Sequence, residues 1–224
     1  MKKKNNRRIM LIKKILLVIF IITYHAPPSM CAELFGVGVH IGAQHDVGNP
    51  TSYDPSIQVD PQNSLLMGLS SKLNLSPLFF RFGIDNTILI NKGKVLDDND
   101  LEEIEYYKIN YTASSLFFGL LFPVRRIGKF YMGGGSTYFI GRGKIKIITD
   151  TSSTEKIDTS AIGFGFITGI ELNLASSIWF YCEWEYMDGK SKAILNADGT
   201  DNWKNFYLDF TGNRILLGII YYLL

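Results

Sequence analysis

The sequence predicts an all-β protein whose main domain is a closed, eight-stranded, antiparallel up-and-down β-barrel that crosses a membrane. Between residues 33 and 224, about eight runs alternate apolar side chains with polar side chains or glycine. This is the period of a strand with two different faces. The connections between the runs are alternately short and long, as in a barrel built from hairpins. No run after the N-terminal segment is uniformly apolar, which excludes helical spans.

The N-terminal segment, residues 1–32, has the composition of a secretory signal peptide. A basic stretch, a continuous apolar stretch and a short, more polar tail follow one another at Met1–Lys14, Ile15–Ile22 and Thr23–Ala32. The apolar stretch is too short to span about 30 Å of hydrocarbon, and Pro27-Pro28 would break a helix there. We therefore expect cleavage near Cys31 or Ala32, with lipidation of Cys31 as the alternative, and one barrel domain over residues 33–224.

The charge balance changes once this segment is set aside. The segment carries seven Lys and Arg and no Asp or Glu, so 16 of the chain's 23 basic residues remain against 21 acidic residues, a net charge of −5. An acidic chain of this kind gives no support for nucleic-acid binding. Cys31 lies at the processing site and Cys182 inside a predicted strand, so we expect no disulfide framework. Phosphate-loop and metal-ligand spacings are missing from the sequence, and no cofactor or metal is expected.

The first two strands show the two faces in a simple form. The first, about Leu34 to Gln44, carries Phe, Val, Ile and Ala at its odd positions and Gly, His40 and Gln at its even positions. The second, about Ser64 to Leu75, sends Leu and Met to one side and Gly, Ser, Asn and Lys72 to the other, and then turns at Ser76-Pro77. We expect the apolar side to face lipid and the polar side to face the lumen.

The third and fourth strands continue the alternation. The third carries Phe80, Phe82, Ile84, Ile88 and Ile90 on one face and Arg81, Gly83, Asp85, Thr87 and Asn91 on the other. The fourth alternates Tyr107, Ile109, Tyr111 and Ala113 with Lys108, Asn110, Thr112 and Ser114. Arg81, Asp85 and Lys108 are therefore assigned to the lumen.

The fifth strand, about Phe130 to Ile148, has no predicted facing. Gly133-Gly134-Gly135 and Gly141-Arg142-Gly143 blur its two faces and indicate bends or bulges. The sixth strand recovers the pattern, with outward Ile162, Phe164, Phe166, Ile170 and Leu172 and inward Gly163, Gly165, Gly169, Glu171 and Asn173.

The last two strands complete the predicted barrel. The seventh alternates Ile178, Phe180, Cys182, Trp184 and Tyr186 with Trp179, Tyr181, Glu183 and Glu185. Glu183 and Glu185 should therefore face the lumen, and Cys182 should face lipid. The eighth, about Phe206 to Leu224, places Phe206, Leu208 and Phe210 opposite Tyr207, Asp209 and Thr211, which assigns Asp209 to the lumen.

Four polar connections are expected to form outer loops on the barrel. They are about Val47 to Asn63, Val95 to Glu103, Arg142 to Thr159 and Asp188 to Asn205. The first contains turn formers such as Asp54-Pro55 and Asp60-Pro61, which cannot continue a strand ladder. Function should reside in these loops, because they are the variable surface that a rigid barrel offers.

A soluble eight-stranded barrel of the lipocalin type is the alternative fold. It would carry its apolar side chains inside and its polar side chains outside, and alternation alone does not say which face is which. One face repeatedly carries Phe, Ile, Leu and Trp, and the other carries Gly, Ser, Thr, Asn and charges of both signs. Since the small and charged face would not form an apolar ligand cavity, the membrane barrel is favoured.

The sequence resembles the eight-stranded outer-membrane barrels of Gram-negative-type bacteria in three features. These are an even number of strands, short turns that alternate with long loops, and a hydrophobic last strand that contains tyrosine. The OmpA-like barrel, OmpX and opacity-type surface proteins share this architecture. The resemblance covers nearly all of residues 33–224, and it rests on pattern. It implies an outer-membrane location, contact with outer-membrane lipid, insertion by the barrel assembly machinery, and a monomer. Family members commonly end in Phe, whereas this chain ends in Leu224 after Ile220 and Tyr222 at alternate positions.

A network of charges is predicted inside the lumen. Its members are Lys72, Arg81, Asp85, Lys108, Glu171, Glu183, Glu185 and Asp209, with His40 nearby. The interior of an eight-stranded barrel is about wide enough for side chains to fill it, so these groups should pair into a plug. The alternative is a cation path through Glu183, Glu185 and Asp85 that Arg81 gates.

Three functions follow from these alternatives. The first is a structural or surface-interaction role, in which the outer loops contact host or environmental ligands. The second is a narrow pore that prefers cations, because five predicted acidic lumen residues face three basic ones. The third is an enzyme of the outer leaflet that uses His45, but no Ser partner accompanies His45 at a recognisable spacing, and we expect no catalytic residues.

Overall fold

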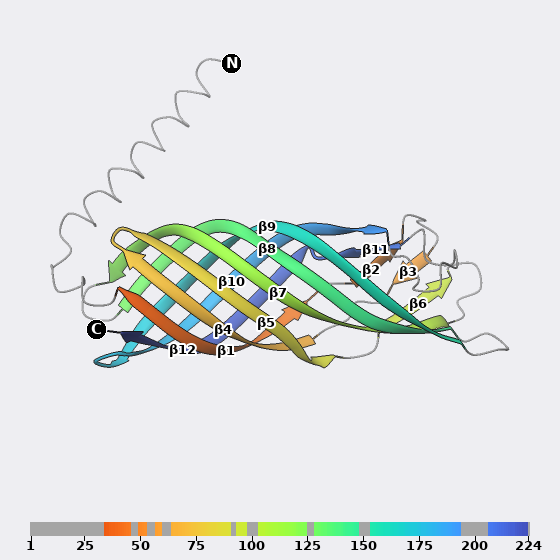
Figure 1. The fold of residues 1–224 in the computed structure, drawn as a ribbon, viewed down its shortest axis with the longest axis horizontal. Helices are drawn as coiled ribbons and strands as arrows, with labels where there is room; N and C mark the ends of the chain where they lie inside the picture. The colour runs from red at the N-terminus through yellow and green to blue at the C-terminus, as the bar shows by residue number, and fades with distance from the viewer. Residues whose placement is uncertain are drawn as a thin grey trace, which may run out of the picture.

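The computed structural model describes residues 34–45, 49–52, 57–59, 64–90, 93–97, 103–124, 128–147, 153–193 and 206–223. These residues form twelve β-strands (Figure 1). The strands are β1 Phe35–His45, β2 Asn49–Ser52, β3 Ile57–Val59, β4 Ser64–Leu75, β5 Leu78–Ile90, β6 Gly93–Asp97, β7 Glu103–Val124, β8 Gly128–Ile147, β9 Ser153–Ala175, β10 Ile178–Ala193, β11 Phe206–Asp209 and β12 Gly212–Leu223. A helix that could span a membrane is not found among these residues. The predicted signal peptide, residues 1–32, lies outside the described residues.

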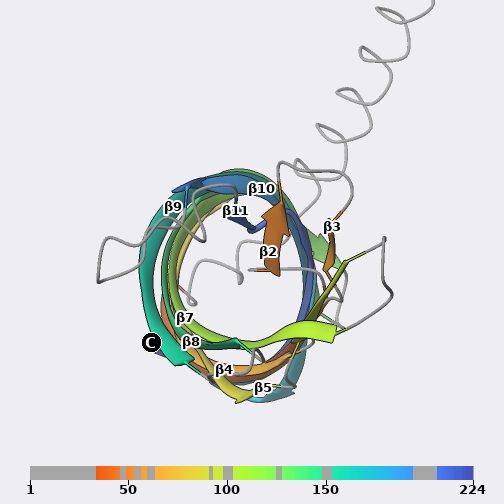
Figure 2. The ribbon, with the colours of Figure 1, turned by 90° about the vertical axis from the view of Figure 1, so that its right-hand side faces the viewer.

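Eight of these strands close into a barrel. Antiparallel pairing joins β12, β1, β4, β5, β7, β8, β9 and β10 in this order, and a further pairing of β10 with β12 closes the ring. The first and last strands pair over their whole length, from Phe35 opposite Leu223 to His45 opposite Asn213. The view along the barrel shows the closed ring (Figure 2). The predicted closed, eight-stranded, antiparallel up-and-down barrel is confirmed.

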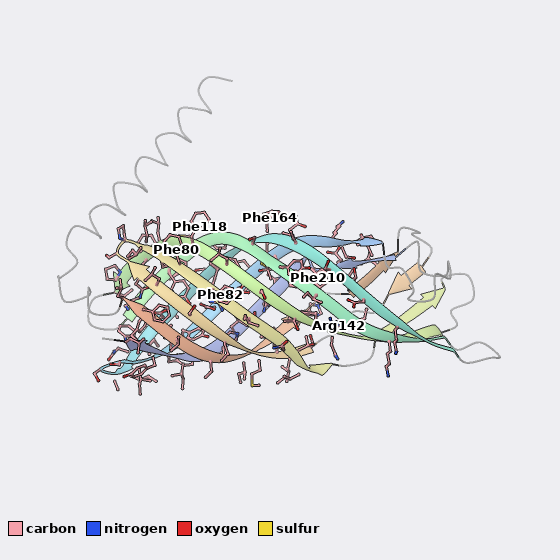
Figure 3. All side chains as sticks on the ribbon, in the orientation of Figure 1. Phe80, Phe82, Phe118, Arg142, Phe164 and Phe210 are labelled. Atoms are coloured by element: carbon pink, nitrogen blue, oxygen red, sulfur yellow. The ribbon has the colours of Figure 1, made fainter. Side chains whose placement is uncertain are left out.

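The outer surface of the barrel is apolar. Alternation sends the bulky side chains of each strand outward, and many of them stay exposed, including Val39, Leu69, Phe118 and Phe164, whose exposed fraction reaches 69%. The side-chain sticks in Figure 3 surround the barrel on the outside. Such a continuous apolar surface would be unfavourable in water and fits hydrocarbon. The interior carries the charged side chains, so the lipocalin alternative does not fit this structure.

The two ends of the barrel differ. At one end, here called the turn end, Ser76-Pro77 joins β4 to β5 and Ser176-Ser177 joins β9 to β10. At the opposite end, here called the far end, β7, β8 and β9 extend beyond the neighbouring strands (Figure 1). These strands contain 22, 20 and 23 residues. Because a strand needs about 9 to 11 residues to cross a bilayer, they are long enough to project beyond one.

The predicted outer loops are shorter than the sequence indicates. In the predicted loop from Arg142 to Thr159, β8 continues to Ile147 and β9 begins at Ser153. In the loop from Asp188 to Asn205, β10 continues to Ala193. The predicted loop boundaries are wrong there because a polar strand resembles a loop in composition, whereas the predicted fifth strand, about Phe130 to Ile148, agrees with the end of β8. Beyond the apolar surface, outward side chains can be polar while the backbone ladder continues.

Short strands occupy the rest of the far end. The strands β2 and β3 lie within the predicted loop from Val47 to Asn63, and β6 overlaps the loop from Val95 to Glu103. The strand β11 pairs with both β10 and β2, and in Figure 2 β2 lies within the outline of the ring. The predicted eighth run is therefore two strands, β11 and β12, separated by Phe210 and Thr211.

Candidate functional site

The interior of the barrel gathers charged side chains of both signs. Among the described residues, the buried Lys, Arg, Asp and Glu number four basic and four acidic. They are Lys72, Arg81, Lys129 and Arg214 with Asp85, Glu171, Glu183 and Glu185. Each lies on one of the eight strands of the barrel, at a position that faces the interior. A buried charge is tolerated only when an opposite charge or hydrogen bonds compensate it.

Two arginines connect three carboxylates in the middle of the interior. Arg81 Nη2 lies 2.7 Å from Glu183 Oε2, and Arg81 Nη1 lies 3.4 Å from Glu185 Oε1. Arg214 Nη1 lies 3.0 Å from Glu185 Oε2, while Arg214 Nη2 donates to Asp85 Oδ2. Glu185 is thus held between two guanidinium groups. Planar guanidinium groups suit such shared carboxylate contacts, because they offer several donors in a fixed geometry.

His40 extends this cluster toward a tyrosine. Its Nε2 contacts the second oxygen of Asp85, and its Nδ1 lies 2.8 Å from the hydroxyl oxygen of Tyr181. The same hydroxyl oxygen lies 3.1 Å from Ser70 Oγ. Both ring nitrogens of His40 therefore have protein partners, and the imidazole links β1 to β5 and β10.

A second cluster lies nearer the turn end. Lys72 Nζ donates to Glu171 Oε1 at 2.6 Å, and the Tyr222 hydroxyl donates to Glu171 Oε2 at 2.8 Å. Lys129 Nζ lies 4.0 Å from Glu171 Oε2 and 4.3 Å from the ring centroids of both Trp179 and Tyr222. Aromatic faces stabilise an ammonium group that has left water. One carboxylate and two rings thus compensate Lys129.

Tyr131 connects the two clusters. The Nζ of Lys72 lies 3.2 Å from the centroid of its ring, and its hydroxyl donates to Glu183 Oε1. The eight buried charges, His40 and the tyrosines therefore form one continuous polar network rather than isolated pairs. Such a network holds strands together that do not pair through their backbones.

An aromatic layer fills the lumen beyond this network, toward the far end. The rings of Phe139 and Phe210 stack at a centroid distance of 4.3 Å, and Tyr111 meets each of them edge-on at 5.9 Å. Leu208 and Ile109 are buried in the same cluster. These side chains pack against one another across the lumen at this level.

Glycines make room for the network at two close approaches. A Cβ atom on Gly68 would lie 2.2 Å from Asp85 Oδ1 and 2.5 Å from His40 Nε2. A Cβ atom on Gly218 would lie 2.5 Å from Cζ of the Tyr181 ring. Such distances are far inside van der Waals contact. Glycine on β4 and β12 thus allows large charged and aromatic side chains to cross a narrow lumen.

The structure brings six of the eight predicted lumen residues together. These are Lys72, Arg81, Asp85, Glu171, Glu183 and Glu185. Asp209 lies apart from them on β11, half-buried, where its Oδ1 accepts from the backbone N–H of Thr211. Lys108 is a residue of β7 whose side chain lies outside the described part.

Two strands face differently from the prediction near the far end. On β7 the buried residues are Ile109, Tyr111 and Ala113, and Asn110 is exposed. On β11 and the residue after it, Leu208 and Phe210 are fully buried. The predicted rule that apolar side chains face outward is wrong there, because the lumen itself is apolar at this level and the outer wall has become polar.

Sequence reasoning missed two members of the network, Arg214 and Lys129. Arg214 follows from the alternation of β12, whose inward positions are Gly212, Arg214, Leu216, Gly218, Ile220 and Tyr222. The signal was hidden because the eighth run was read from Phe206 with the opposite facing. Lys129 stands one residue before the predicted start of the fifth strand, at Phe130, and that strand had no predicted facing.

In this interior, the buried basic and acidic side chains neutralise one another. Within the described residues, no group of three or more His, Cys, Asp or Glu side chains is arranged to hold a metal ion. The carboxylates contact arginine, lysine, histidine or tyrosine donors instead of open space. This arrangement can lock the barrel and block the lumen.

Comparisons with known proteins show which known fold this chain shares. No protein-family model matches the chain, and no curated protein matches it. Among solved structures, the outer membrane protein OprG from Pseudomonas aeruginosa superposes with a TM-score of 0.57 at 12% identity, over 86% of this chain and 97% of that one. Neisserial surface protein A, NspA, matches with a TM-score of 0.47 at 13% identity, over 84% of this chain and 97% of that one. The similarity to OprG shows a shared fold, that of an outer-membrane β-barrel.

Proposed function

From this shared fold, we propose that the protein is an outer-membrane protein with a sealed lumen that anchors its far end outside the cell for contacts with surface or environmental ligands. The observation that supports this is the filling of the lumen. Four basic and four acidic buried side chains compensate one another, and an aromatic layer closes the lumen beyond them. A rigid barrel of this kind serves as a support for exposed segments.

The far end would carry the contacts in this proposal. Strands β7, β8 and β9 extend beyond the neighbouring strands there, and β2, β3, β6 and β11 add short strands at the same end. We also propose that the barrel assembly machinery inserts the chain and that the barrel is a monomer, as the resemblance to small barrels implies. Size-exclusion chromatography with light scattering of the protein in detergent checks the monomer.

Single-channel recording in planar bilayers tests the sealed lumen. The purified protein is first shown to be folded by the change in its gel migration on boiling, which closed barrels show. We expect no conductance steps from folded protein, because an ion would have to break paired charges in a low-dielectric lumen. Regular steps from folded protein, lost after boiling, would contradict the proposal.

The cation-selective pore is the weaker alternative. Its support was an excess of five acidic over three basic lumen residues, but the buried charges that the structure describes are four of each sign. A balanced lining offers no electrostatic reason for cation preference. We also propose no catalytic role, since both ring nitrogens of the buried His40 contact Asp85 and Tyr181, and His45 ends β1 with an exposed side chain.

A further inference from the structure

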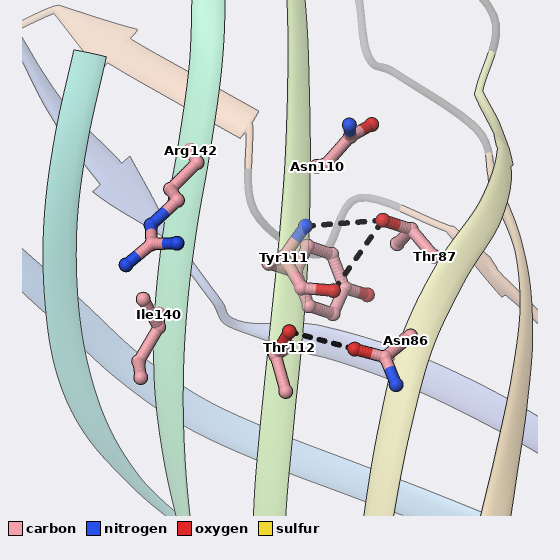
Figure 4. A pocket seen from close by; sticks show the side chains of 7 residues that line it. All are labelled: Asn86, Thr87, Asn110, Tyr111, Thr112, Ile140 and Arg142. Carbon is pink, nitrogen blue, oxygen red and sulfur yellow. Dashed lines mark hydrogen bonds between the residues drawn. The ribbon is translucent and has the colours of Figure 1, made fainter.

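A pocket opens in the outer wall of the barrel where β5 separates from β7. Their ladder ends at Asn86 opposite Thr112, and farther along β7 pairs with β6 instead, from Tyr107 opposite Gly93. At the separation, the Thr87 side chain takes the place of a backbone partner. Its Oγ1 accepts from Tyr111 N at 3.0 Å and lies 3.3 Å from Tyr111 O, as Figure 4 shows. These two contacts fix the position of β5 relative to β7 at the point where their backbone ladder ends.

The pocket has a volume of about 300 Å³ and a mixed lining, in which polar side chains stand beside apolar surface. It is lined by Asn86, Thr87, Asn110, Tyr111, Thr112, Ile140 and Arg142 (Figure 4). Thr112 Oγ1 donates to Asn86 Oδ1 at 2.7 Å, which leaves the NH₂ group of the Asn86 side chain for a further partner. Arg142 contributes a guanidinium group from β8, and Asn110 a second amide from β7. Hydrogen-bond donors of this kind suit an oxyanion ligand.

A surplus of positive charge lies beside the pocket. Lys144 on β8 and Lys156 on β9 are directly opposite each other, next to the pair of Arg142 and Asp158, and all four side chains are exposed. Like charges opposite each other destabilise a sheet. Of these four side chains, only that of Asp158 is acidic, and it lies 3.7 Å from Arg142 Nε. Both side chains of this ion pair are more than 70% exposed, so the pair is weak. An anion placed here would relieve the repulsion.

The pocket lies at the border of the apolar surface. On β8 and β9, the outward residues just before Arg142 and Asp158 toward the turn end are Ile140 and Ser160, and then Tyr138 and the exposed Ile162. In Figure 3, Arg142 lies closer to the far end than the labelled outward residues Phe82, Phe118 and Phe164. Polar and basic side chains directly beyond an apolar belt occupy the level of lipid headgroups, where tyrosines also concentrate.

We propose that the pocket and the three cations Arg142, Lys144 and Lys156 bind the phosphate of a lipid headgroup in the leaflet at the far end of the barrel. The inference rests on the proposed membrane role and names a partner for the outer wall. The guanidinium group of Arg142 would hold the phosphate oxygens, and the two lysines would balance its charge. The acyl chains would follow the apolar wall toward Ile84 and Leu116.

Native mass spectrometry of the full chain in neutral detergent tests this site. The probes are phosphatidic acid, a diacylglycerol with the same acyl chains, and inorganic phosphate. We expect phosphatidic acid to bind at least about tenfold more tightly than diacylglycerol, and inorganic phosphate in millimolar excess to leave the bound lipid in place. Equal binding of the two lipids would overturn the proposal, and displacement by inorganic phosphate would show a soluble-anion site instead.

Single and double substitutions test which side chains bind phosphatidic acid. We expect R142Q to weaken phosphatidic acid binding about tenfold, R142K to weaken it less, and K144Q/K156Q to weaken it in the same direction. The control K190Q removes an exposed cation from β10, away from the pocket, and should bind like the parent protein. Unchanged binding in R142Q, or an equal loss in K190Q, would contradict the site.

The folding state and the conductance are measured on the same samples. Arg142 is exposed, so its replacement should leave the gel shift on boiling unchanged. If the folded protein does not bind phosphatidic acid and also gives no conductance, the lipid site is contradicted and the proposal of a sealed lumen stands. If the folded protein conducts ions and binds phosphatidic acid as expected, the proposal of a sealed lumen is contradicted and the lipid site stands.

Discussion

Arg214 on β12 donates to Asp85 on β5 across the barrel interior, although 129 residues separate them and their strands are not neighbours in the sheet. Three strand boundaries lie between β12 and β5 along the shorter way around the ring, through β1 and β4. The contact therefore exists only once the barrel has closed. It joins the last strand of the chain to the first half of the barrel and places Arg214 between Asp85 and Glu185.

Replacing Arg214 should destabilise the barrel strongly. R214M leaves Asp85 and Glu185 each without one buried partner, and breaking a buried ion pair from one side costs about 3–5 kcal/mol. Urea unfolding in lipid vesicles, followed by tryptophan fluorescence, measures the loss. The exposed variant K190M should lie within about 0.5 kcal/mol of the parent. A loss below about 1 kcal/mol for R214M would show that the network does not stabilise the barrel.

Removing both partners of this contact tests whether their effects are coupled. D85L and R214M each break the Arg214–Asp85 pair and leave one of its two charges without this partner, whereas the double variant leaves neither charge of the pair behind. We expect the double variant to lose less stability than the sum of the single variants, by about 1–3 kcal/mol. Additive losses in the same urea experiment would show that the two side chains act independently.

Gly68→Ala should be unfavourable for a steric reason. The added Cβ would lie 2.2 Å from Asp85 Oδ1 and 2.5 Å from the Ile84 backbone oxygen, and a backbone atom cannot move without its strand. We expect a loss of about 1–3 kcal/mol. Gly134→Ala is the matched control, because the atom nearest to its added Cβ, Gly165 O, would be 3.5 Å away. Equal effects of the two substitutions on urea unfolding would contradict the close approach at Gly68.

Phe210→Ala should weaken the aromatic layer but leave the lumen closed to ions. Phe210 is fully buried and stacks on Phe139, so its truncation removes contacts worth about 3–5 kcal/mol and leaves a cavity. The charged network nearer the turn end stays in place. Urea unfolding should therefore report the loss of stability while planar bilayers stay silent. Conductance steps from the folded variant would identify the aromatic layer as the main seal.

Cys182 should report the lipid-facing side of β10. It is partly exposed, and its neighbours along the strand, Tyr181 and Glu183, are buried in the lumen. In vesicles we expect an apolar maleimide to label Cys182 and a charged maleimide to leave it unlabelled until the protein is unfolded. The control is K190C in a C182S background, which both reagents should label. Rapid reaction of Cys182 with the charged reagent would place it in water.

The sequence determined much of the architecture. Alternation with a period of two identifies all the barrel strands except β8, whose faces are blurred by glycines, because each strand presents one face to lipid and the other to the interior. On β1, β4, β5, β9 and β10 it also assigns the faces, and so it places Lys72, Arg81 and Asp85 in the lumen. These strands combine bulky apolar residues on one side with small or charged residues on the other.

The tertiary structure decided where apolar side chains face the interior instead of the lipid, and which charged side chains contact one another. Ile109, Tyr111 and Phe210 point inward because the interior is apolar near the far end, where outward side chains such as Asn110 and Arg142 are polar. Alternation predicts two faces but not the environment that each face meets at a given height. The partners of Arg214 depend on the closure and stagger of the ring, which bring together side chains from strands distant in the sequence.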